Sequence, residues 1–340
     1  MKRNYHLLSA FLPAVGMAML ILDSKTAITG AKEGLSLCLQ TAIPCLFPFF
    51  VMSNMLTVSL VGRSPRLLLP IRNLCRIPEG AEGILLIGLL GGYPVGAQSI
   101  TQAYQSGSLS KEDARRLLGF CSNAGPSFIF GIVGNMFSTK KTLWILWFIH
   151  ILSALFVGSI LPHGHKATRC KITKQHADLP RAVTQSVRAL CSVCGWIILM
   201  RVVITFLDRW ILWMLPKYIQ VLLIGFFEIT NGCHMLLNTE PEFIRFVISA
   251  AMLGFGGICV SMQTVSVTQG LGTGMYFPGK ILHGLISLLL STAVAPVLYS
   301  VSISGLWTAL LSLLFLCIVT TALLWRIEGK SCSIFGKVSV

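Results

Sequence analysis

Residues 84–100 read Ile84-Leu-Leu-Ile-Gly-Leu-Leu-Gly-Gly-Tyr-Pro-Val-Gly-Ala-Gln-Ser-Ile100, and this stretch decides the fold. A Gly-Gly-Tyr-Pro sequence interrupts an apolar run at its centre. Glycine weakens a helix and proline removes a backbone N–H donor, so we expect the helix to break there. Irregular backbone at membrane depth is tolerated only where it is buried in protein or lines water. The stretch therefore predicts a broken or re-entrant helix inside a membrane protein.

The composition of the whole chain supports a membrane location. Of its 340 residues, 54% are hydrophobic and 11% are charged, and the mean hydropathy is +0.77. Soluble domains carry about 25% charged residues, so a soluble enzyme and a disordered protein are excluded. The apolar runs are continuous and do not alternate with polar residues as in a β-barrel. The fold class predicted is all-α, a polytopic transmembrane helical bundle.

Ten apolar segments can be distinguished along the chain, at 7–22, 34–62, 83–105, 116–138, 142–162, 189–214, 216–236, 243–269, 281–300 and 303–326. Basic residues gather at the N-terminus, in 63–76, in 163–188 and in the C-terminal tail, which should face the cytoplasm. Five segments separate the N-terminus from 163–188, and five more precede the tail. An odd number of crossings cannot return the chain to the same side. In each half, at least one segment should therefore fail to cross or form a hairpin, and the segments interrupted by glycine or proline are the candidates.

These features give a division of the chain. We expect an N-terminal transmembrane helix over 1–30, a first repeat half over 31–162, a basic cytoplasmic loop over 163–188, a second half over 189–326 and a cytoplasmic tail over 327–340. The net charge of +15 is explained by the basic loops. No nucleic-acid motif accompanies it, so the expected partner is the lipid bilayer and no nucleic acid is expected.

An internal repeat links the two halves. Gly91-Gly-Tyr-Pro-Val-Gly-Ala-Gln-Ser-Ile100 matches Gly256-Gly-Ile-Cys-Val-Ser-Met-Gln-Thr-Val265 at a constant offset of 165. A weaker match pairs Ala42–Val51 with Ala189–Ile198. The order is the same in both halves, which indicates a duplication; the alternative is chance similarity between glycine-rich membrane segments.

Broken helices in duplicated halves are where secondary transporters bind their substrates. A further interrupted segment, Gly119–Gly131, contains Asn123 and Gly125-Pro126, and could instead be a kinked helix whose freed groups are met by Ser and Asn side chains. The predicted substrate-binding residues are Gly92, Tyr93, Pro94, Gln98, Asn123, Gly125, Pro126, Gly256, Gly257 and Gln263.

A carboxylate lies within the apolar segment 216–236. Glu228 would be costly there unless it faces a partner or a water-filled path. Thr230 and Asn231 could complete an oxygen-rich site for a coupling cation. The alternatives are a structural ion pair, for which Arg201 is the candidate, or a position near the membrane interface. Ser110 and Asp113 are expected to cap a helix that begins there.

The chain resembles the sporulation integral membrane protein YlbJ family, whose members carry the Gate, or nucleoside-recognition, domain. The resemblance rests on Gly92-Tyr-Pro-Val-Gly-Ala97, Leu118-Gly-Phe-Cys-Ser-Asn-Ala-Gly-Pro-Ser127, Glu228-Ile-Thr-Asn-Gly232 and Gly254-Phe-Gly-Gly257 with Gln263. It implies a multi-pass bacterial cell-membrane protein associated with sporulation and the spore cortex. The domain name implies a nucleoside-like ligand.

Three functions are compatible with these features. The first is a secondary-transporter-like gate for a small polar solute or ion. The second is a non-transporting scaffold that docks other sporulation membrane proteins through its basic loops. The third is an intramembrane enzyme acting on a lipid-linked precursor. No nucleophile–base pair, metal-ligand cluster or cofactor motif supports the third, so we expect no enzymatic activity, no metal and no cofactor.

Overall fold

The computed structural model describes residues 2–162, 170, 178–237, 239, 241–268 and 270–300. The described residues form helices joined by turns, with no strand among them. Five helical stretches within them are long and apolar enough to cross a membrane: Ser24–Thr57, Lys140–Ile160, Leu179–Trp210, Glu242–Val267 and Tyr276–Tyr299. The predicted class, an all-α polytopic membrane protein, is confirmed. The apolar segment 303–326, the tail and most of the 163–188 loop lie outside the described residues.

The N-terminal region differs from the single helix expected over 1–30. Helix α1 (Lys2–Leu22) ends at Asp23, whose carboxylate accepts a hydrogen bond from the Thr26 backbone at 3.3 Å and caps the next helix. That helix, α2 (Ser24–Leu37), continues through a π-helical turn, η1 (Cys38–Ala42), into α3 (Ile43–Leu60). The first helix therefore ends where the apolar segment 7–22 ends, and residues 24–30 of the expected helix belong to α2.

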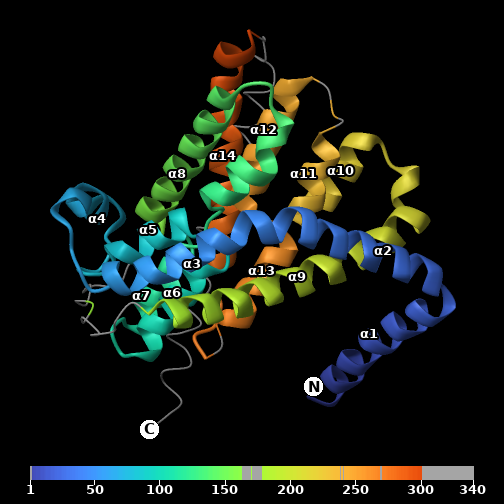
Figure 1. The fold of residues 1–340 in the computed structure, drawn as a ribbon, viewed down its shortest axis with the longest axis horizontal. Coiled ribbons are helices and arrows are strands. Elements are labelled where there is room, and N and C mark those ends of the chain that lie inside the picture. The colour runs from blue at the N-terminus through green and yellow to red at the C-terminus, as the bar shows by residue number, and fades with distance from the viewer. Residues whose placement is uncertain are drawn as a thin grey trace.

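The long α2–α3 helix runs antiparallel to α9 (Leu179–Trp210), and the two lie side by side in Figure 1. Two glycines of α2 permit the close approach. A Cβ atom added at Gly30 would lie 2.9 Å from the Val202 Cα, and one at Gly34 would lie 2.8 Å from the Ile198 Cα. Small residues at a helix–helix contact are typical of membrane proteins, where backbone proximity replaces the hydrophobic effect.

Three further long helices pack as a bundle: α8 (Lys140–Ile160), α12 (Glu242–Phe255) and α14 (Tyr276–Tyr299). They stand upright together in Figure 1, across the direction of the α2–α3 and α9 pair. Helix α12 and helix α14 approach through Gly254, where an added Cβ atom would lie 2.8 Å from the Gly284 Cα. Helix α12 breaks at Gly256 and continues as α13 (Gly257–Val267).

The apolar segment 83–105 is a helical hairpin. Helix α5 (Glu82–Leu90) and helix α6 (Val95–Gln105) pack against each other, and Gly91–Pro94 forms the turn at the tip. Gly92 has a φ of +76°, which suits glycine and is strained for other residues. The stretch 84–100 therefore breaks as predicted, and the chain reverses there.

The apolar segment 216–236 is a second hairpin. Helix α10 (Lys217–Phe227) and helix α11 (Ile229–Leu236) pack side by side, with Glu228 between them at the tip. Each half of the chain therefore contains one hairpin, as the parity of the basic loops required. The interruption in this second hairpin is a carboxylate, whereas we expected a glycine or proline pair.

The remaining helices are short and connect these parts. They are η2 (Arg66–Leu68), α4 (Leu69–Cys75), α7 (Lys111–Leu117), η3 (Ser127–Ile132), η4 (Val133–Met136) and η5 (Leu212–Met214). Ser110 caps α7 as predicted, because its hydroxyl accepts from the Asp113 backbone N–H at 3.1 Å. Between α7 and η3 the backbone of residues 118–126 is almost entirely non-helical.

Hydrogen bonds define two ends of the molecule. At one, which we call the basic end, the Arg116 guanidinium donates to the backbone oxygens of Cys75 and Gly158 at 2.7 and 2.6 Å, joining α7, α4 and the last turns of α8. At the opposite end, the Ser138 hydroxyl donates to Glu242 at 2.7 Å, joining the start of α8 to the start of α12. Arg63, Arg66, Arg72, Arg76 and Arg115 lie in the segments that meet at the basic end.

The two hairpins open toward opposite ends. Hairpin α5–α6 begins and ends next to α4 and α7, at the basic end, while α11 ends next to the start of α12, at the opposite end. Helices α3 and α9 likewise run in opposite directions, as do α8 and α14. In each half the order is a long helix, a hairpin, a broken crossing segment and a long helix, and the halves are inverted.

This arrangement corrects the predicted repeat. The offset of 165 aligned the tip Gly91–Pro94 with Gly256-Gly257, which is a break in a crossing segment and not a hairpin tip. By position in the fold, the counterpart of Gly91–Pro94 is Glu228, and the counterpart of residues 118–126 is Gly256-Gly257. The weaker match of Ala42–Val51 with Ala189–Ile198 joins α3 to α9, which do correspond.

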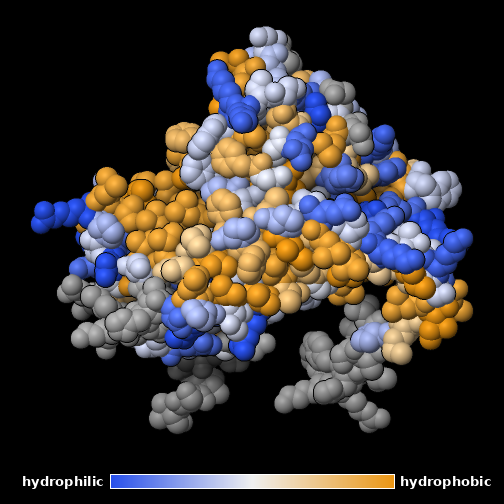
Figure 2. Space-filling view, viewed as in Figure 1, coloured by the Kyte–Doolittle hydropathy of each residue, from blue (hydrophilic) through white to orange (hydrophobic). Residues whose placement is uncertain are grey.

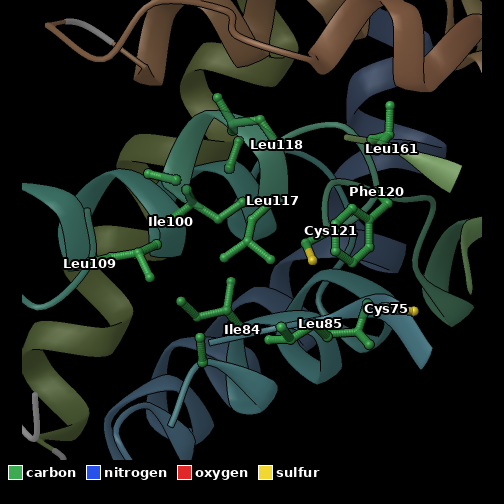
Figure 3. Close-up of a cluster of buried hydrophobic side chains, with 14 of the residues drawn as sticks. Cys75, Ile84, Leu85, Ile100, Leu109, Leu117, Leu118, Phe120, Cys121 and Leu161 are labelled. Atoms are coloured by element: carbon green, nitrogen blue, oxygen red, sulfur yellow. The ribbon is translucent and has the colours of Figure 1, made fainter. Parts of the chain in front are cut away.

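The surface and the core agree with a membrane setting. On the face shown in Figure 2, hydrophobic side chains form broad continuous areas and hydrophilic ones gather toward the edges. The core at the basic end packs the first hairpin against α7 and the end of α8, with Ile84, Ile100, Leu117, Phe120 and Leu161 buried together (Figure 3). This packing holds helices α5 and α6 in place. It thereby positions the tip between them, which lies deeper in the protein.

Candidate functional site

The tip of the first hairpin lies against the non-helical segment 118–126. A Cβ atom added at Gly92 would lie 2.9 Å from the Gly125 backbone nitrogen, so the two backbones touch. Gly88 and Gly96 of the same hairpin face the Cys121 carbonyl at comparably short range. Three glycines thus bring α5–α6 into direct backbone contact with the first broken segment.

Tyr93 connects this tip to the second broken segment. Its hydroxyl donates a hydrogen bond of 2.9 Å to the carbonyl of Leu253, in the last turn of α12. A Cβ atom added at Gly256 would lie 3.1 Å from the same hydroxyl. The carbonyls at a helix end lack intrahelical partners, and Tyr93 satisfies one of them. The predicted site residues Tyr93 and Gly256 are therefore in contact, although they come from different halves.

Glu228 forms the tip of the second hairpin and is buried, with 1% of its surface exposed. Its two carboxylate oxygens accept hydrogen bonds from the Thr230 backbone at 3.0 Å and the Asn231 backbone at 2.7 Å, so the side chain caps α11. The Asn231 side-chain amide adds a third bond at 2.7 Å. N–H donors and the positive end of a helix stabilise a carboxylate, and the oxygen that accepts from Thr230 keeps capacity for a further donor.

This geometry bears on two ideas about Glu228. Arg201, the candidate for an ion pair, does not contact Glu228 directly: the guanidinium binds Glu33 at 2.6 Å and reaches the Asn231 side-chain oxygen at 3.2 Å. The oxygen-rich cation site stays a prediction; in this structure the Thr230 and Asn231 backbone N–H groups donate to Glu228, and the Asn231 side-chain oxygen accepts from Arg201. The described residues contain no cluster of three or more His, Cys, Asp or Glu side chains that could hold a metal ion.

A small cavity lies between the two hairpin tips. Its volume is about 30 Å³, room for one or two water molecules. Both hairpins, both broken segments, α3 and α9 contribute to its lining. The polar and backbone groups come from Gly92, Tyr93, Gly125, Ser127, Glu228, Thr230 and Gln263, and the apolar wall includes Leu46, Phe128, Val193, Ile197 and Val260.

The cavity gathers six of the predicted residues: Gly92, Tyr93, Gly125, Glu228, Thr230 and Gln263. Three others lie one contact away: Asn231 bonds Glu228, Gly256 touches Tyr93, and an added Cβ at Gly257 would lie 3.2 Å from the Gly225 carbonyl of the second hairpin. Pro94, Gln98, Asn123 and Pro126 are not among its lining residues. Gln98 and Gln263, paired by the sequence repeat, thus occupy unlike places.

Three buried ionisable residues were not predicted from the sequence. Lys280 and His283 on α14 are 0% exposed and His150 on α8 is 2% exposed. The Lys280 ammonium donates to the Asn123 side-chain oxygen at 3.3 Å and lies 5.0 Å from the centre of the Tyr93 ring. The signal was present: a lysine and a histidine three residues apart in an otherwise apolar segment share one helix face.

Comparisons with known proteins bear on the family. Over 315 residues the chain is 27% identical to the sporulation integral membrane protein YlbJ of Bacillus subtilis (strain 168), an alignment that covers 79% of this chain and 77% of that protein. The chain is therefore similar to this sporulation protein over most of its length. No family model matches the sequence, and no solved structure matches the fold. This similarity to an integral membrane protein, together with the apolar helices, supports a location in a membrane.

In this chain, the motifs that carried the resemblance all belong to one region. Gly92–Ala97 forms the first tip, Leu118–Ser127 the first broken segment, Glu228–Gly232 the second tip with its helix, and Gly254–Gly257 the second broken segment. These four stretches meet around the cavity. The residues that carry the resemblance to the YlbJ family are therefore those that build the candidate site.

Proposed function

We propose that the protein is a secondary-transporter-like gate that moves a small polar solute or ion across the bacterial cell membrane during spore formation. The observation that supports this most directly is the meeting of two oppositely oriented hairpins at a small cavity that the Glu228 carboxylate and the Gln263 amide help to line. Inverted halves with broken helices around a central site are the architecture of many secondary transporters. The sporulation context comes from the printed name of the YlbJ relative.

The chemistry of the cavity suggests the class of solute. The Glu228 carboxylate and the Gln263 amide line one cavity with Ser127, whose hydroxyl has no hydrogen-bond partner among the described residues. These groups would recognise a small solute that carries hydrogen-bond donors or a positive charge. A nucleoside needs a pocket of about 300 Å³ or more, so it could enter only after the hairpins separate.

The hairpins provide the moving parts of the proposed cycle. Each tip contacts the broken segments through backbone and a few side chains, so either hairpin could swing without unfolding its own helices. Displacing α5–α6 would open the cavity to the basic end, and displacing α10–α11 would open it to the other. The basic end faces the cytoplasm in this proposal, because positive residues favour that side. The proposal includes no enzymatic step.

Ligand-dependent thermal unfolding of the detergent-purified protein tests this function. The panel contains nucleosides, nucleobases, organic acids, amino acids and Na⁺. A ligand that binds only the folded state adds about 2.7 kcal/mol at 100 times its dissociation constant. We expect one compound to raise Tm in the wild type and in Glu112→Gln, an exposed carboxylate on α7, but not in Glu228→Gln. If no compound raises Tm and exchanges within 163–188 abolish sporulation while Glu228→Gln does not, the protein is a scaffold.

A further inference from the structure

A stripe of polar side chains runs along one face of α14. Tyr276, Lys280, His283, Ser287 and Ser291 follow one another at intervals of three or four residues, which places them on the same side of the helix. All five are 0% exposed, so the stripe faces the protein interior. Ionisable groups buried in a membrane helix are expensive and usually mark a path for ions or protons.

The Lys280 ammonium has few interactions that offset the cost of burying its charge. An ammonium has three donors, and here one reaches the Asn123 oxygen at 3.3 Å while the Tyr93 ring lies 5.0 Å away. Among the described residues, no carboxylate forms an ion pair with it. A charge that is buried with so little compensation favours release of its proton, since the neutral amine is less costly to bury.

The neighbouring histidines have fixed protonation patterns. His150 Nε2 accepts from the Ala124 backbone N–H at 3.1 Å, so its proton must be on Nδ1. His283 Nε2 lies 3.0 Å from the His150 carbonyl and must donate to it. The rings stack with centroids 4.5 Å apart. His283 Nδ1 therefore holds a lone pair that has no partner among the described residues.

We propose that Lys280 and His283 form a proton-exchange site inside the membrane domain. A proton on Lys280 Nζ passes to water, either directly or by way of the lone pair on His283 Nδ1, one helical turn away. The N–H bond on lysine breaks, an O–H bond forms on water, and the positive charge leaves the protein interior with the proton. No oxidant or other reactant is involved.

The site touches the gate through Tyr93. The Tyr93 ring faces Lys280, and the same residue lines the cavity and holds the α5–α6 tip against α12. A cation attracts an aromatic face, whereas a neutral amine loses this attraction. Loss of the proton would therefore loosen the first hairpin. This step rests on the proposed function and identifies its coupling ion as H⁺.

Other titratable groups face Lys280 and must be separated from it in any experiment. They are Tyr93 from the first hairpin, Cys121 from the segment 118–126, His150 from α8, and Tyr276 and His283 from α14 itself. A variant at Lys280 alone leaves all of these unchanged. The difference between that variant and the wild type therefore reports on Lys280.

The test is the Tm of the purified full chain between pH 6 and pH 9, for the wild type, Lys280→Met and Lys280→Arg. If the folded protein releases the lysine proton in this range while the unfolded chain retains it, the stability of the wild type rises with pH. We expect the Tm of the wild type minus that of Lys280→Met to increase by roughly 3 °C or more. The Tm of the wild type minus that of Lys280→Arg should increase with pH as well, because arginine keeps its charge.

Lys111→Met, at an exposed position on α7, serves as the matched control. Its Tm should differ from that of the wild type by the same amount at every pH. Lys280→Gln replaces Lys280→Met if the methionine variant does not fold. The proposal is overturned if the Tm of the wild type differs from those of Lys280→Met and Lys280→Gln by an amount that is constant with pH. This readout needs no solute, so its failure is distinct from a failure of the ligand panel.

Discussion

The two hairpins do the same task with different chemistry. The tip of α5–α6 is made of Gly91–Pro94 and is held by backbone contact with Gly125. The tip of α10–α11 is a single carboxylate, Glu228, that caps the returning helix. The first tip depends on the absence of side chains and the second on one charged side chain. A chain reversal in a membrane can therefore be stabilised by close packing or by local capping.

The glycine-built tip should be the more sensitive to a small change. Gly92→Ala places a Cβ against Gly125 and forces alanine to a φ of +76°. We expect a loss of about 3 kcal/mol, seen as a Tm lower by roughly 5–10 °C in detergent. The contact and the conformation both contribute to this loss.

Gly107→Ala separates the two contributions. Gly107 has a φ of +69° but nothing lies within 4 Å of an added Cβ. Its replacement should cost about 1 kcal/mol, from conformation alone. Equal losses at both glycines would mean that the contact with Gly125 does not hold the first tip.

The carboxylate tip should respond less to an isosteric change. Glu228→Gln keeps the shape but replaces one acceptor oxygen by an N–H₂ group that faces backbone donors. We expect a loss of about 2 kcal/mol in the free energy of unfolding, because a buried N–H is left unsatisfied. Glu112→Gln, in the exposed first turn of α7, should change stability by less than about 1 kcal/mol. An unaltered Tm in Glu228→Gln would show that the cap is dispensable.

The two glutamines aligned by the sequence repeat provide the finest comparison. Gln263 lines the cavity, whereas Gln98 does not. For a compound that stabilises the wild type, Gln263→Ala should raise the dissociation constant about tenfold, or about 1.4 kcal/mol. Gln98→Ala should leave it within about twofold. Equal effects, measured by ligand-dependent Tm, would mean that the two glutamines are equivalent, as the sequence repeat suggested. Gln98 would then belong to the site as well.

The comparison also explains what could be predicted from sequence. Gly91–Pro94 was recognised because glycine and proline break helices by local rules, and the parity of basic loops then required a hairpin in each half. The second hairpin was assigned wrongly because its tip contains neither residue. A carboxylate that caps a helix looks, in sequence, like a functional charge in mid-membrane, and only packing shows that α10 folds back onto α11.

The site was likewise predictable only in part. Gly92, Tyr93, Glu228 and Gln263 were identified from interrupted segments and do meet at the cavity. The Lys280 cluster was overlooked because its members are far apart in sequence: His150 belongs to α8, Asn123 to the broken segment and Tyr93 to the first tip. Contacts between α14 and these elements arise from tertiary packing, which local patterns do not report.

The central claim is that the two hairpins open to opposite sides of the membrane. Gln105→Cys, at the base of α5–α6, and Lys217→Cys, at the base of α10–α11, are exposed positions that test it directly. Each variant is labelled with a membrane-impermeant thiol reagent from one face of sealed vesicles at a time, and labelling is counted above the parent chain. We predict that the two positions react from opposite faces, Gln105→Cys from the cytoplasmic one. Reaction of both from the same face would contradict the inverted arrangement and the gate built upon it.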